Sequence, residues 1–246
     1  MRTNLRQAFY IGLFDSLPTL RDPGVIFLLS LLSFLPVLFI YVFTGTGSAA
    51  LGSIAGATVL ILAFTGLNAA QSVYFNKHWF RFQDMLVATG VAPTTYALGL
   101  SLGTLVVSLP AVVLSIGLLL AGSFPGGLQI LLAIGSILVL WVAMIFIGFS
   151  IGTATKNLRR ANSLAPILSI ILGFLPPVYY PLSRLPDYLQ PLAMLVPTTD
   201  AAQLVKYYFG LLPLSALNVE ISWMILAVFA VVTAFVAIKR ANWVDP

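Results

Sequence analysis

The sequence predicts an all-α polytopic membrane protein, and three observations lead to this fold class. Of its 246 residues, 60% are hydrophobic and only 8% are charged, whereas soluble domains carry about 25% charged residues. Two stretches, between Asp22 and Lys77 and between Asp84 and Lys156, contain no Asp, Glu, Lys or Arg. Each stretch exceeds the roughly 20 residues that an apolar helix needs to cross a bilayer.

Six apolar segments are long enough to cross the bilayer, and we expect them to form one transmembrane domain over residues 1–246. A helix rises about 1.5 Å per residue, so each segment can cross a hydrocarbon core of about 30 Å. Glycine-rich turns at 45–47 and 122–127 separate neighbouring spans. The predicted spans are Gly24–Phe43, Ala49–Phe75, Thr94–Ala121, Leu128–Thr155, Ser163–Tyr180 and Ala216–Ile238.

The basic residues predict the orientation of these spans. Ten lysines and arginines fall on the side that holds both termini, and two, Arg184 and Lys206, fall on the other. Basic loops mark the cytoplasmic face of a membrane protein. Both termini are therefore predicted to be cytoplasmic in a multi-pass protein of the cell membrane. The net charge of +5 is assigned to this bias and not to nucleic-acid binding.

Residues 1–22 are predicted to form a helix in the cytoplasmic interface of the bilayer. Leu5, Phe9, Leu13 and Leu20 recur at roughly helical spacing. The apolar part is too short for a signal peptide and is not followed by small residues. An apolar face on a short basic helix is typical of a helix that lies along the membrane surface. The alternative interpretation is a frayed tail.

The segment 76–93 places a cluster of charges between the second and third spans. Lys77, Arg81 and Asp84 together would cost about 8–10 kcal/mol at the bilayer centre, so the segment must lie outside the hydrocarbon. We expect a helix capped by Asn76 and ended by Gly90 and by the proline three residues later. It either rests on lipid headgroups or docks on a cytoplasmic partner through its aromatic residues.

Residues 181–215 are predicted to form short re-entrant helices at the outer surface, because their prolines exclude a straight span. Thr198 or Thr199 is expected to cap the second of these helices. Asp200 suits its first turn, and Gly210 suits its end. The segment is either a gate over an exit path or a purely structural cap.

Three stretches of this chain together resemble the type-2 ABC-transporter permease family, the membrane subunits of one class of ABC exporters. They are "LRDPGVIF", "FRFQDMLVATGVAPTTYALG" and "PLSRLPDYLQPLAMLVPTTDAAQLVKYYFG". Their order within a chain of six predicted spans matches the family pattern. The chain departs from that pattern in the second stretch, where it has Gln83 and Asp84 although family members often carry glutamates.

The resemblance implies a permease that pairs with a second copy, or with a homologous permease, and with two cytoplasmic ATPase subunits. The segment 76–93 would then be a coupling helix that passes ATPase motion to the spans, and the bend after the fifth span would be an outer gate. The implied coupling residues are Lys77, Trp79, Phe80, Arg81, Phe82, Asp84, Met85 and Leu86. The implied gate residues are Phe174, Pro176, Pro177, Tyr179 and Tyr180.

The chain carries no sequence motif for an enzyme. It has no Gly-x-x-x-x-Gly-Lys-[Ser/Thr] loop for ATP phosphates, so ATP and Mg would be bound by the partner subunit. It has no cysteine, and its one histidine, His78, has no neighbouring ligand for a metal. We therefore expect no cofactor in this chain and no catalytic residue.

Asn68 and Gln71 are the most polar groups deep in the predicted spans and are the candidates for a substrate path. Most such residues instead bond between helices. The alternative function is a secondary carrier or another transporter outside the ABC class. A proton-driven carrier needs titratable groups within the membrane, and the predicted spans place no acidic or basic residue in the middle of the membrane.

Overall fold

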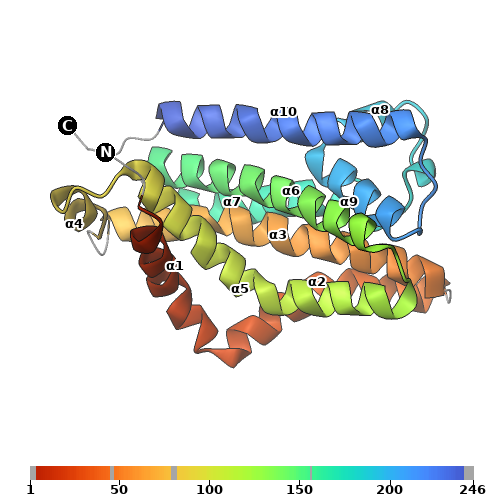
Figure 1. Ribbon diagram of the computed structural model, residues 1–246, viewed down its shortest axis with the longest axis horizontal. Coiled ribbons are helices and arrows are strands. Elements are labelled where there is room, and N and C mark those ends of the chain that lie inside the picture. Colours follow the sequence, from red (N-terminus) through yellow and green to blue (C-terminus); the bar gives the residue numbers. More distant parts are fainter. Residues whose placement is uncertain (1–3, 45–46, 79–81, 156, 241–246) are drawn as a thin grey trace.

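The computed structural model describes residues 4–44, 47–78, 82–155 and 157–240, and every regular element within these ranges is a helix. Long helices run side by side along the molecule (Figure 1). In chain order, the helices are α1 (Leu5–Leu20), α2 (Pro23–Thr44), α3 (Gly47–His78), α4 (Phe82–Ala88), α5 (Pro93–Gly122), α6 (Gly127–Ala154), α7 (Leu158–Phe174), α8 (Gln190–Met194), α9 (Pro197–Tyr208) and α10 (Ala216–Arg240), with a 3₁₀ turn η1 (Leu182–Arg184).

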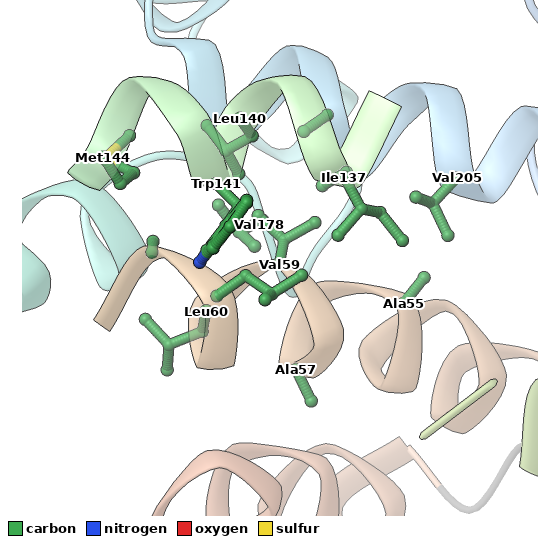
Figure 2. Packing of buried hydrophobic residues seen from close by; sticks show 14 of the residues in the cluster. Ala55, Ala57, Val59, Leu60, Ile137, Leu140, Trp141, Met144, Val178 and Val205 are labelled. Atoms are coloured by element: carbon green, nitrogen blue, oxygen red, sulfur yellow. The ribbon is translucent and has the colours of Figure 1, made fainter. Parts of the chain in front are cut away.

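Helix α3 is the centre of the bundle and contacts α2, α5, α6, α7 and α9. Its most extensive contact is with α6, where Val59 and Leu60 lie against Leu140 and Trp141 (Figure 2). Val205 from α9 joins the same cluster. Because α3 is surrounded by other helices, its apolar residues are buried in protein, whereas many on α2, α5 and α10 stay exposed.

Glycines bring several helices of the bundle into close contact. A Cβ added to Gly148 would lie 2.6 Å from the carbonyl oxygen of Gly66 in α3. A Cβ added to Gly99 would meet Ile11, and one on Gly103 would lie 2.8 Å from the carbonyl oxygen of Gly12. Small residues of this kind let helix backbones approach each other in membranes. Helix α1 is thereby fixed on α5.

Within the described part of the chain, four helices are long and apolar enough to cross a membrane: Ala49–His78, Thr94–Gly122, Gly127–Ala154 and Ala216–Ala237. These correspond to the second, third, fourth and sixth predicted spans. Phe34–Phe43 and Ser163–Gly173 are shorter apolar helices within α2 and α7. The first and fifth spans therefore stay predictions.

The fifth apolar segment ends earlier than its sequence predicts. Helix α7 stops at Phe174, six residues before the predicted end at Tyr180, and the chain then bends. Pro176 and Pro177 follow at once, and proline can neither donate a helical hydrogen bond nor fit inside a helix without a clash. Apolar character continues to Tyr180, but helical structure does not.

The bundle has two distinct ends, which we name by their short helices. At the α4 end lie α4, the start of α5 and the last turn of α10, with α1 beside them (Figure 1). At the α9 end lie α8 and α9, and α9 packs against both α6 and α10. Helix α9 is not spread over the surface, because nearly all of its residues are buried.

Candidate functional site

The predicted coupling segment consists of the last turn of α3 and the short helix α4. Lys77 and His78 belong to α3, and α4 begins at Phe82. Trp79, Phe80 and Arg81 lie outside the described residues, and Asp84 lies within α4. The structure therefore places half of the predicted coupling residues on one short helix beside the bundle.

The prediction that Asn76 caps a separate helix is wrong. Asn76 lies inside α3 and is only 7% exposed. Its side chain hydrogen-bonds Asp15 of α1 and lies beside Tyr96 of α5. These tertiary contacts hold Asn76 inside the bundle, and α3 continues for two more residues, to His78.

Helix α4 has one face anchored on the bundle and one face that is free in this chain. Leu86 is 9% exposed and packs in a cluster with Val91 and Tyr96. The Phe82 ring stacks on the Phe14 ring of α1, with 5.2 Å between centroids. Met85 is 58% exposed. Leu86 therefore holds α4 in place, and Met85 belongs to the face that a partner could reach.

The turn after α4 matches the prediction that Gly90 ends this helix. Gly90 has φ = +73°, a conformation that residues with a Cβ rarely adopt. The backbone N–H of Val91 donates to the carbonyl oxygen of Leu86 at 2.9 Å, which is typical of a glycine-terminated helix. This turn carries the chain directly into α5 at Pro93, so α4 and α5 are closely linked.

A polar cluster behind α4 was not found from the sequence. Asp15 of α1 is hydrogen-bonded by the side chains of Ser72 and Asn76 in α3. Its burial raises its pKa to about 6, although these two hydrogen bonds oppose the rise. Asp15 joins the first helix of the chain to the central one.

Asp15 also borders a polar cavity of about 220 Å³ between α1, α2, α3 and α5. Asn68 and Gln71, the residues predicted for a substrate path, both line it. Its lining is Asp15, Thr19, Val25, Thr65, Asn68, Gln71, Ser72, Thr104 and Val107. The structure therefore brings the two predicted residues together and adds a carboxylate that the sequence analysis had placed on the interfacial helix.

The predicted outer gate is a buried, non-helical stretch at the α9 end. Pro176, Pro177 and Tyr179 are buried, Tyr180 is half-buried, and Phe174 is the last residue of α7. The Tyr180 hydroxyl donates to the carbonyl oxygen of Leu175, five residues earlier, at 3.2 Å, so the side chain turns back along its own segment.

Side chains from two other helices satisfy the backbone of this stretch. The Lys206 ammonium group of α9 donates to the carbonyl oxygen of Val178 at 2.7 Å. The Ser53 hydroxyl of α3 lies 3.4 Å from the carbonyl oxygen of Tyr179. Irregular backbone inside a membrane protein needs such partners. The bend after α7 is therefore tied to both α3 and α9.

Helix α9 carries buried polar residues whose role differs from the predicted one. The N-cap of α9 is Val196, which makes no capping side-chain bond, so neither Thr198 nor Thr199 caps the helix. The Thr198 hydroxyl instead donates to the carbonyl oxygen of Leu172 in α7 at 2.5 Å. The cap prediction is wrong because this threonine bonds to a neighbouring helix. Asp200 lies in the first turn as expected.

Comparison with known proteins gives one family. The sequence model of the ABC-2 type transporter family matches residues 15–210. The matched range begins at Asp15 and ends at Gly210, just after α9, so it includes α4, the polar cavity and the bend after α7. No curated protein sequence matches the chain.

Proposed function

The chain belongs to the ABC-2 type transporter family, and from this premise we propose that it forms the substrate path of an ATP-driven exporter in the plasma membrane. It is the membrane component of an ABC transporter, a multi-pass protein that works with ABC ATPase subunits. In the proposed assembly, two permeases and two ATPase subunits form the working unit. The ATPase subunits bind ATP and Mg.

The observation that carries the coupling proposal is the two-sided packing of α4. Its inner face, through Leu86 and Phe82, contacts the bundle and α1. Its outer face, at Met85, is free in this chain. A short helix held this way moves with α1 and α5. We propose that closure of the ATPase subunits pushes on the Met85 face and thereby shifts both helices.

The substrate path in this proposal starts at the polar cavity and ends at the bend after α7. Asn68 and Gln71 face the cavity, where a passing substrate could bond to their amides. At the α9 end the stretch from Pro176 to Tyr180 blocks the exit of this path, and the hydrogen bond from Lys206 to Val178 holds it there. Breaking that hydrogen bond would open the gate.

The proposed topology has six spans with both termini in the cytoplasm. It includes α2 and α7 as the first and fifth spans and places the α4 end inside. The ten-to-two distribution of basic residues supports this orientation. Two termini on the same side of the membrane require an even number of crossings, and six spans satisfy that requirement.

Single cysteines test orientation and docking together, because the natural chain has none. We expect Met85→Cys, carrying a photo-cross-linker, to form a covalent product with the ATPase subunit. An impermeant maleimide should reach it only after the cells are permeabilised. The matched control is Phe124→Cys in the turn between α5 and α6, where the side chain is 92% exposed. It should react in intact cells and give no cross-link.

Two results of this experiment would contradict the proposal. Labelling of Met85→Cys in intact cells would reverse the orientation. Equal cross-linking from Met85→Cys and Phe124→Cys would show that the product does not report docking at α4.

A further inference from the structure

The polar cavity between α1, α2, α3 and α5 is rich in hydrogen-bond acceptors. It contains one carboxylate, two amides and four hydroxyl groups, and neither lysine nor arginine contributes to its described lining. Asp15 provides the only formal charge of that lining, and it is negative. A cavity with this composition favours a positively charged hydrogen-bond donor over an anion.

The hydroxyl groups add to this preference for a hydrogen-bond donor, because several of their protons are already donated to other groups of the protein. The Thr65 hydroxyl donates to the carbonyl oxygen of Ile61 at 2.9 Å, and the Thr104 hydroxyl donates to that of Ser101 at 2.9 Å. The Ser72 side chain is bonded to Asp15. What Thr65 and Thr104 offer to a guest is therefore oxygen lone pairs.

The size of the cavity suits a headgroup and not a whole drug-sized molecule. Its volume is about 220 Å³, whereas sites for drug-sized ligands span roughly 300–1,000 Å³. A narrow crevice begins next to it and shares two lining residues, Thr65 and Val107. The crevice is mostly apolar, with Ile26, Ile61 and Phe64 among its walls. The crevice adjoins the cavity but, at about 10 Å³, has room for no more than about one water molecule.

We propose that this site binds an amphiphilic cation, with its ammonium headgroup at Asp15 and its apolar tail leaving the cavity past Val25, which lines it and is 39% exposed. The inference rests on the proposed transport function, because it names the substrate class of that path. Hydrogen bonds to the Asp15 carboxylate and to neutral oxygens would replace the water around the headgroup. The tail would lie against aliphatic side chains, which an anionic or fully polar substrate could not exploit.

The test is direct binding to the purified permease in a nonionic maltoside detergent, without any ATPase. The probes are a fluorescent primary alkylammonium compound, whose headgroup carries N–H donors, and the corresponding neutral alcohol, followed by anisotropy. We expect the wild-type protein to bind the cation at least about tenfold more tightly than the alcohol, since bonds to charged groups are the stronger class. Asp15→Asn should remove this difference.

Two matched pairs separate binding from folding. Asp22→Asn removes a carboxylate from the exposed corner before α2, and its amide oxygen can still accept from Gly24 and Val25. It should bind the cation as the wild type does. Thr65→Val should weaken binding by about threefold, since it removes one neutral acceptor. Thr58→Val, two turns earlier on α3 with the same type of internal bond, should not.

A final arm identifies the source of the ammonium group. Competition by phosphatidylethanolamine, but not by phosphatidylglycerol, would assign the site to an aminolipid headgroup. Competition by neither would assign it to a free amphiphile. Equal binding of the cation and the alcohol, or unchanged binding in both Asp15→Asn and Thr65→Val, would overturn the proposal. Because no ATPase is present, these outcomes are independent of the docking experiment at Met85.

Discussion

The Gly148→Leu permease is expected to lose its folded structure, or to unfold about 6–12 °C lower than the wild type in detergent. A single added carbon at Gly148 would lie 2.6 Å from the carbonyl oxygen of Gly66 and 2.8 Å from that of Leu67. Both atoms belong to the backbone of α3, so no rotamer change relieves the clash. Overpacking of this kind costs about 3 kcal/mol or more, and here it separates the two helices that share the largest contact.

Gly117→Leu is the matched control, because Gly117 lies within α5 and a Cβ there would meet nothing within 4 Å. Leucine has the higher helix propensity, so this variant should be as stable as the wild type or more stable. The measurement is the thermal midpoint together with the elution profile in detergent. Equal midpoints for the Gly148→Leu and Gly117→Leu proteins would show that α3 and α6 do not pack as closely as described.

The Met85→Asp permease is expected to insert and fold normally but to lose its ATPase subunit during purification. Met85 is 58% exposed in this chain, so the change removes little internal packing. If Met85 is buried by the partner, its loss costs about 1.5–3 kcal/mol, and a buried, unpaired carboxylate adds a further penalty. Phe82→Asp would be a less clear variant, because it also breaks the stack on Phe14.

Asn157→Asp is the control for an added negative charge on the same side. Asn157 is exposed, and its side-chain oxygen accepts from the backbone N–H of Arg159 at the start of α7. Aspartate keeps that cap. The ATPase should co-purify with Asn157→Asp at wild-type yield. Wild-type recovery of the ATPase with Met85→Asp would mean that α4 rests on lipid headgroups and does not dock on a partner.

Hydropathy was enough to predict the long helices, because in this chain apolar length and helix length coincide. The ends of the predicted segments at Leu128–Thr155 and Ala216–Ile238 lie within two residues of the ends of α6 and α10. The prediction failed where apolar character outlasts helical structure. Tyr180 was assigned to a span although two prolines interrupt the helix before it.

The polar residues could not be placed from the sequence, because their partners are far away along the chain. Asn76 has the composition of a helix cap, yet its partners come from α1 and α5. Asp15 was counted as part of an interfacial helix. The close packing of α1 against Gly99 and Gly103 of α5 places Asp15 next to Ser72 and the cavity. Lys206 was assigned to the outer side of the membrane. Its hydrogen bond to the carbonyl oxygen of Val178 depends on the bend after α7.

The central claim is that this chain converts the ATP cycle of a separate subunit into transport. Its most direct test is the rate of ATP hydrolysis in proteoliposomes containing the permease alone, the cognate ATPase alone, or both. We expect no turnover from the permease alone, because it lacks a phosphate-binding loop, and a faster rate from the two together than from the ATPase alone. Robust hydrolysis by the pure permease, or no change in the ATPase rate when the permease is added, would contradict the account.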